Sequence, residues 1–301
     1  MAKIFVTPQF IRLHPQLRGV SDPRQIHFHF RPIRPAYIMV SLDPVSGEVN
    51  LSGGTYGPVC DDPLTVALHI HERSFDATRN VITRGVGTEV VLGLPSRHII
   101  TQTWMTALPL PRGISEADVG HFTLFPSRWV KPPSIAECPV NLECVVTFIT
   151  RYGTHHIVFC KVIGASIETD LLGRPRQELI RLYPTFECDD IENRWGGAIE
   201  RLSVMGPILP SPVFPCGPKA GLKGDVRTWI TDLVTDGLLL PQDAELLRQW
   251  LAQWEAIAHH PEAAEWRTLR SRLSRAIELM AWEEFPALHE FLLTAAQGES
   301  A

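Results

Sequence analysis

The most specific part of the sequence is FTLFPSRWVKPPSIAECPVNLEC, which spans residues 122–144. Its four prolines favour strands and turns over helices. Where it ends, apolar residues begin to alternate, and the alternation resumes after the turn at residues 151–154. The alternating residues are Leu142, Cys144, Val146, Phe148, Ile157 and Phe159. Because residues two apart lie on the same face of a strand, residues 142–159 are predicted to form a β-hairpin with one buried face.

Shorter strand-like segments precede this hairpin along the chain. They lie at residues 36–42, 48–52, 64–70 and 89–94. A turn at 43–47, Asp-Pro-Val-Ser-Gly, separates the first two, and residues 74–83 have a helical pattern. Five or more strands in mostly local order predict a closed barrel.

Composition and charge exclude several classes of protein. The 301 residues include 28 Lys and Arg against 33 Asp and Glu, so the net charge is 28 − 33 = −5. This charge argues against a general nucleic-acid or anionic-membrane binder. No apolar run approaches the roughly 18 residues of a transmembrane helix. Residues 1–20 lack the apolar core of a secretory signal, so we expect a cytoplasmic protein.

The composition changes near Pro218. Of the 25 prolines, 22 lie at or before this residue, whereas five of the eight tryptophans follow it. The charge changes too, because 20 basic and 20 acidic residues precede the boundary while 8 and 13 follow it. We therefore predict a β-barrel domain over residues 1–207, a Pro-rich linker over 208–218 and an α-helical domain over 219–301.

Apolar residues in the last segment recur at helical spacing in three stripes. The stripes are Val226, Trp229, Ile230 and Leu233, then Leu247, Trp250, Leu251, Trp254 and Ala258, then Trp266, Leu269, Leu273, Ile277 and Met280. Helix starts are predicted near Asp225, Asp243, Pro241, Pro261 and Pro286. We expect a small bundle with the tryptophans in its core.

Most motifs that carry chemistry are absent or weak. Two HxH pairs, at residues 27–29 and 69–71, lack a convincing third ligand, and we predict that they bind no metal. The six cysteines form no CxxC pair, and Cys144 and Cys160 are expected to be buried thiols. No GxSxG, GxGxxG or GxxxxGK[ST] motif offers a hydrolase elbow or a nucleotide loop.

The segment Asn50 to Gly57, NLSGGTYG, is the most suggestive candidate for binding. It is predicted to leave a strand into a glycine-rich loop, whose free backbone N–H groups could bind an anion. A plain tight turn has the same composition, so the two interpretations remain open.

The order of these motifs resembles that of the flavin reductase-like family. The resemblance covers roughly residues 30–200, and residues 122–144 match the family's pattern with few departures. Further matches are the strand Tyr37 to Ser41, a turn ending in Asn50, Thr55-Tyr56, and the strand that ends at Pro95. The resemblance implies a mainly β fold, a split β-barrel of the FMN-binding type, here followed by the α-helical domain.

The same resemblance implies that FMN binds with its phosphate near the glycine segment and the helix at residue 74, and its ring near a homodimer interface. The cofactor-binding residues it implies are Ser41, Asn50, Ser52, Gly53, Gly54, Thr55, Tyr56, Arg73, Ser74 and Arg79. Phe75 and Ala77 stand where the family has Lys and Thr, and Gly93 stands where it has Asn. Arg73 or Arg79 is predicted to supply the missing positive charge.

These observations leave three hypotheses. The first is an NAD(P)H-dependent flavin reductase or related oxidoreductase, with FMN as the hydride acceptor and no catalytic acid or base required. The second is a flavin-binding electron carrier or regulator. The third is a flavin-free or non-catalytic barrel, a scaffold whose acidic helical tail binds a partner protein.

Overall fold

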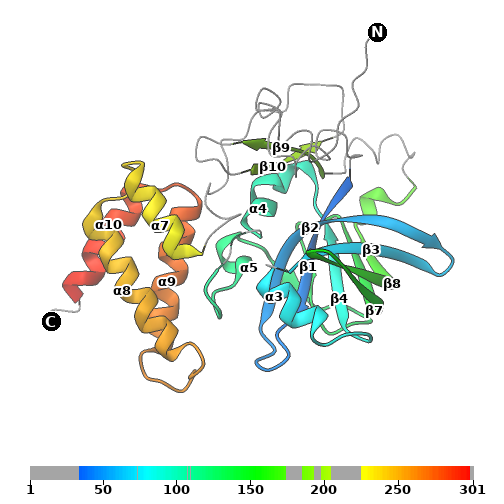
Figure 1. Cartoon of the computed structure of the whole chain (residues 1–301), viewed down its shortest axis with the longest axis horizontal. Coiled ribbons are helices and arrows are strands. Elements are labelled where there is room, and N and C mark those ends of the chain that lie inside the picture. The colour runs from blue at the N-terminus through cyan, green and yellow to red at the C-terminus, as the bar shows by residue number, and fades with distance from the viewer. Residues whose placement is uncertain are drawn as a thin grey trace, which may run out of the picture.

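Six antiparallel strands close into a barrel in the computed structural model of the protein. The structure describes residues 34–72, 74–106, 108, 110–173, 185–192, 198–204 and 225–298. The order around the barrel is β1-β2-β3-β8-β7-β4, and β4 pairs back with β1 (Figure 1). These strands are β1 (Arg34–Leu42), β2 (Val49–Asp61), β3 (Leu64–His71), β4 (Glu89–Leu94), β7 (Val140–Tyr152) and β8 (His155–Ile167). The predicted mainly β class, with a split barrel and C-terminal helices, is confirmed.

Strand β1 is apolar on both sides because both of its faces are covered. Tyr37 and Met39 belong to the cluster of buried side chains inside the barrel. Ile38 and Val40 belong to a second cluster, which includes Ile99 of the segment outside the barrel. A strand that is buried on both faces has a continuous apolar run instead of an alternating one.

The turn between β1 and β2 forms as its sequence predicts. The Oδ1 atom of Asp43 accepts hydrogen bonds from the backbone N–H groups of Val45 (2.8 Å) and Ser46 (2.9 Å). Gly47 has a φ of +73°, which a residue without Cβ adopts at little cost. This turn brings Asp43 to the mouth of the pocket described below.

The stretch at residues 122–144 folds back onto the start of β7. The buried carboxylate of Glu143 accepts hydrogen bonds from the backbone N–H groups of Arg128, Trp129 and Val130. Asn141 bonds to both the N–H (2.9 Å) and the C=O (3.0 Å) of Ile135. The short strands β5 (Leu124–Phe125) and β6 (Ser134–Ile135) pair within this stretch. The predicted hairpin of β7 and β8 follows directly.

Short helices and two further strands surround the barrel. The strands β9 (Thr185–Glu192) and β10 (Ala198–Val204) extend the sheet beyond β1. The predicted helix after β3 is α3 (Phe75–Ala77), continued by a π-helical turn, η2 (Thr78–Ile82). Further short helices among the described residues are η3 (Arg97–Ile99), α4 (Ile100–Met105), α5 (Glu116–Val119) and η4 (Thr169–Leu171).

The chain ends in four helices, α7 (Val226–Thr235), α8 (Pro241–Ile257), α9 (Trp266–Ala281) and α10 (Phe285–Gly298). Asp225 caps α7 and Pro241 opens α8, as predicted. The prediction for Pro261 was wrong: residue 261 lies in a turn and α9 begins at Trp266, because residues 260–265 turn between the two helices. Among the described residues, no helix has the length and apolar character needed to span a membrane.

The four helices share a hydrophobic core with the segment that connects β4 to β5. Met105, Leu108, Leu110, Ile114 and Val119 are buried in the same cluster as the tryptophans of α7 and α8. In Figure 1, α4 and α5 lie between the barrel and the helical bundle. The linker predicted at residues 208–218 lies outside the described residues, and the division into two domains stays a prediction.

Candidate functional site

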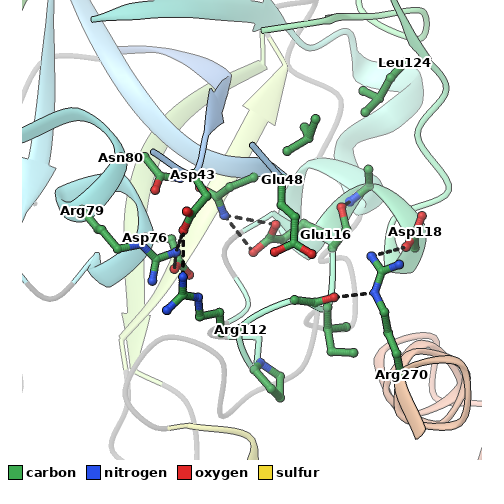
Figure 2. Close-up of a pocket in the computed structure, with 17 residues that line it drawn as sticks. Asp43, Glu48, Asp76, Arg79, Asn80, Arg112, Glu116, Asp118, Leu124 and Arg270 are labelled. Atoms are coloured by element: carbon green, nitrogen blue, oxygen red, sulfur yellow. Dashed lines mark hydrogen bonds and ion pairs between the residues drawn. The ribbon is translucent and has the colours of Figure 1, made fainter. Parts of the chain in front are cut away.

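A pocket of about 200 Å³ lies where the barrel meets the helical bundle. Its wall comes from the turn before β2, from α3 and η2, from residues 111–118 and from α9. The ionisable residues that line it are Asp43, Glu48, Asp76, Arg79, Arg112, Glu116, Asp118 and Arg270. Figure 2 shows Asp43, Asp76, Arg79 and Arg112 gathered on one side and Asp118 with Arg270 on the other, with Glu116 between them.

A chain of hydrogen bonds between polar side chains runs behind this wall. The Nδ2 group of Asn80 donates to Ser41 Oγ (3.2 Å), and the Ser41 hydroxyl donates to Asn50 Oδ1 (3.4 Å). Asn50 Nδ2 in turn donates to both carboxyl oxygens of Glu116, each at 3.2 Å. The chain therefore joins β1, β2, η2 and α5. It includes two residues implied by the family resemblance, Ser41 and Asn50.

Glu116 is the most perturbed carboxyl group of the pocket. It is 4% exposed and also accepts a hydrogen bond from the backbone N–H of Leu51 (3.2 Å). Burial raises its pKa to about 8, although hydrogen bonds from the backbone and from Asn50 oppose the rise. Near neutral pH this group is therefore mostly protonated, and it can bind or release a proton in the physiological range.

The two aspartates that contact Arg79 have pKa values shifted in opposite directions. Burial raises the pKa of Asp76, and the nearby Arg79 guanidinium only partly opposes this. Burial also favours a higher pKa for Asp43, but the N–H groups of Ser46 and Val45, followed by Arg79 and Arg112, outweigh it and lower the pKa. Asp43 is therefore held as the anion.

Arg79 is neutralised by carboxylates. Its Nη2 lies 2.8 Å from Asp43 Oδ2 and 2.9 Å from Asp76 Oδ1. Arg112 approaches the same Asp43 oxygen at 3.6 Å. To bind a phosphate, Arg79 would first have to give up one of these charge-assisted bonds. Arg73, the other predicted source of charge, lies outside the described residues.

The predicted glycine-rich loop is a strand, and this prediction was wrong. Residues 49–61 run continuously through β2, paired first with β1 and then with β3. The backbone N–H of Gly53 donates to Thr106 O (3.2 Å), and a Cβ on Gly53 would lie 2.7 Å from Thr106 Oγ1. A Cβ on Gly54 would lie 2.6 Å from the Tyr37 hydroxyl. The glycines thus serve close packing within the barrel wall.

The other implied residues lie apart from the pocket. Thr55 is buried in β2, and Tyr56 packs against the barrel core, where burial raises its phenol pKa. Ser52 is half-buried in the same strand. The Ser74 carbonyl accepts the N–H of Thr78, which begins the helical turn. Of the nine implied residues that the structure describes, only Asn50 and Arg79 line the pocket, with Ser41 bonded behind them.

Sequence patterns missed much of the pocket wall. Glu116, Arg112 and Arg270 carry no motif, since each is brought to the pocket by contacts between distant segments. Asp43 lies in the predicted turn and Asn80 in the predicted helix. These patterns did not reveal which side chains the two residues contact. Ser115, which caps α5, was the one local signal that a helix starts at Glu116.

The histidine pairs show no metal-binding arrangement in the described part of the chain, where no group of three or more His, Cys, Asp or Glu side chains is placed to hold an ion. His71 instead packs edge-on against the His155 ring, with centroids 4.8 Å apart. The pair at residues 27–29 lies outside the described residues. Cys144 and Cys160 are buried free thiols, as predicted.

The described residues that line the pocket do not fit a phosphate dianion. Of the charged groups that line the pocket, five are carboxyl groups and three are guanidinium groups, and Arg79 is already paired twice. The backbone at residues 52–56 belongs to the barrel sheet and forms no anion-binding loop. The pocket is also smaller than the roughly 300–1,000 Å³ that usually hold a drug-sized ligand.

The six closed strands, with a polar pocket at one side, make the fold a small antiparallel β-barrel. Residues 32–181 match the flavin reductase like domain. The chain belongs to this family, which the resemblance of its sequence motifs had indicated.

Two solved structures are similar to this chain in fold. Nitrilotriacetate monooxygenase component B from Bacillus cereus is 16% identical with a TM-score of 0.51, over 69% of this chain and 100% of that one. A protein from Shewanella frigidimarina NCIMB 400 with a flavin reductase split barrel is 12% identical with a TM-score of 0.50, over 65% and 96%.

An uncharacterized protein of Pyrococcus abyssi is 33% identical over 89 residues, 29% of this chain. The chain spans about half the length of the curated relatives it matches.

Proposed function

We propose that the protein is a flavin-dependent oxidoreductase that takes a hydride from NAD(P)H and passes it to FMN. The observation that carries this proposal is the membership of residues 32–181 in the flavin reductase-like family, on a closed six-stranded barrel. A flavin supplies the redox chemistry itself, so the protein needs to bind and orient it without a catalytic triad.

The described residues expected to hold the FMN phosphate have structural roles in the barrel and in ion pairs. The expected position holds a strand and a doubly paired arginine, so we derive no step through the bound flavin. Changing Phe75→Lys restores the residue type of the family. If the phosphate lies beside this helix, the new charge-assisted bond should raise FMN affinity by roughly 10- to 150-fold.

The test uses the purified full chain. Its absorbance in the flavin bands is recorded first, and FMN, FAD and riboflavin are then titrated by fluorescence. NADH and NADPH oxidation is followed with each flavin. Flavin uptake with turnover supports the proposal, whereas a colourless protein that takes up no flavin and oxidises neither nucleotide would end it.

A second candidate function is a non-catalytic barrel whose helices bind a partner protein. Two observations favour it. Arg79, which was expected to bind the cofactor, is neutralised by Asp43 and Asp76, and the helices share a core with residues 105–119. Failure to bind any flavin, together with retained folding, would select this candidate. The cytoplasmic location remains a prediction. The homodimer expected from the family resemblance also remains one, and the elution volume of the purified chain in size-exclusion chromatography tests it.

A further inference from the structure

In the pocket between the barrel and α9, the arginines are paired, whereas some carboxyl groups have no cationic partner among the described residues. Arg79 is held by Asp43 and Asp76, and Arg112 also approaches Asp43. Arg270 donates to the Gly113 carbonyl (2.7 Å) and lies 4.0 Å from Asp118. Among the described residues that line this pocket, each arginine is thus matched by an acceptor.

Two carboxyl groups of the wall are left without a cationic partner. Glu48 accepts only a hydroxyl hydrogen bond, from Ser46 Oγ (3.2 Å), among the contacts of the described residues. Glu116 accepts bonds from neutral groups: its own backbone N–H, the Leu51 N–H and the Asn50 amide. A cation bound between Glu48 and Glu116 would meet two carboxyl groups that no basic residue of the described wall pairs with.

An independent observation also points to a hydrogen-bond donor. Asn80 is completely buried and lines the pocket, and its Oδ1 atom has no hydrogen-bond partner. Its amide nitrogen, Nδ2, donates a hydrogen bond to Ser41 Oγ. A buried acceptor without a hydrogen bond costs free energy, so the site favours a ligand that donates an N–H bond to Asn80 Oδ1. Arg79 Nε also lacks a partner, but its guanidinium is already neutralised and adds no net positive charge.

We propose that this pocket binds a small organic cation, a short primary amine or diamine, whose ammonium group lies against Glu48, Glu116 and Asn80. The volume of about 200 Å³ suits a short chain. Arg270 closes one side of the pocket, so the C-terminal helices form part of the site. This inference does not depend on the proposed oxidoreductase activity.

Binding is coupled to a proton because Glu116 is buried. Its pKa of about 8 means that an arriving ammonium group displaces a proton to form the ion pair. Affinity should therefore rise by up to about tenfold per pH unit below pH 8. The charged and polar groups that surround Glu116 are Asn50, Asp43, Glu48, Asp76, Arg79, Arg112, Asp118 and Arg270.

Putrescine is the probe, titrated calorimetrically into the full chain near pH 6, 7 and 8, in buffers of different ionisation enthalpy. We expect tighter binding at higher pH and release of up to one proton. Glu116→Gln should weaken binding roughly tenfold or more and abolish the proton release. The matched control is Glu245→Gln, which removes an exposed carboxyl of α8 away from the pocket and should change nothing.

Glu48→Gln keeps the test decisive if the buried variant does not fold, because Glu48 is only half-buried at the rim. It too should weaken putrescine binding. Absence of putrescine binding, unchanged binding in Glu48→Gln, or tighter binding of inorganic phosphate or Mg²⁺ at this site would each overturn the proposal. Flavin uptake and nucleotide oxidation are measured separately, so either proposal can fail while the other stands.

Discussion

Substitution of Glu116 by Gln should remove a pH dependence of folding stability. In the folded protein this carboxyl has a pKa of about 8, against an ordinary value of 4.5. Between these values the folded state holds a proton that the unfolded state has lost. The free energy of unfolding therefore falls as pH rises, by about 1.4 kcal/mol per pH unit.

The size of the effect follows from the two pKa values. Their difference of about 3.5 corresponds to about 5 kcal/mol of stability, present in full below pH 4.5 and lost by pH 8. Glutamine resembles the neutral carboxyl group and can still accept from Leu51 and Asn50. We therefore expect the variant to match the parent near pH 5 and to be more stable by several kcal/mol near pH 8.

Urea unfolding, followed by tryptophan fluorescence at steps between about pH 5 and pH 8.5, measures this difference. Glu245→Gln is the matched control, because it removes an exposed carboxyl and should preserve the pH profile of the parent. If the Glu116→Gln variant and the parent lose stability in parallel across this range, Glu116 ionises normally and the reasoning from its burial is refuted.

Three further substitutions test the packing. Gly93→Ala places a Cβ 2.8 Å from Cys138 Sγ in the barrel wall, and should lower the free energy of unfolding by about 1–3 kcal/mol in chemical denaturation. Met105→Ala removes a fully buried side chain from the core shared with the helices; we expect a loss of about 2–5 kcal/mol and one common unfolding transition for barrel and helices. Asp225→Ala removes the side chain that accepts the Thr228 N–H at the start of α7, and should cost about 1 kcal/mol in thermal or urea unfolding.

Each of these has a control and a contrary outcome. Gly57→Ala adds a Cβ that meets nothing within 4 Å, so equal losses in both glycine variants would contradict the packing argument. Val86→Ala truncates an exposed side chain and should be nearly neutral. Two separate transitions in Met105→Ala would show that the helices unfold on their own. For the cap, Glu245→Ala removes an exposed carboxyl inside α8, and a loss as large as that of Asp225→Ala would show that the hydrogen bond to the Thr228 N–H is not the cause.

Sequence patterns located most elements because those patterns are local. Alternation predicted the hairpin of β7 and β8, and Asp43 and Gly47 satisfied the turn between β1 and β2 through bonds only a few residues apart. Helical spacing found the stripes of α7, α8 and α9. The segment at residues 50–57 was misjudged, since glycines occur both in loops and in strands that pack closely against a neighbour.

By itself the sequence determined the barrel strands, their turns, the apolar stripes of the helices and the family to which the chain belongs. Only the tertiary structure decided where charge and polarity meet. Asn50 and Glu116 are 66 positions apart, and Arg270 reaches Gly113 across 157 positions. The physical reason is that backbone periodicity is set within a few residues, whereas the pKa of Glu116 and the pairing of Arg79 depend on which distant groups exclude water or supply charge.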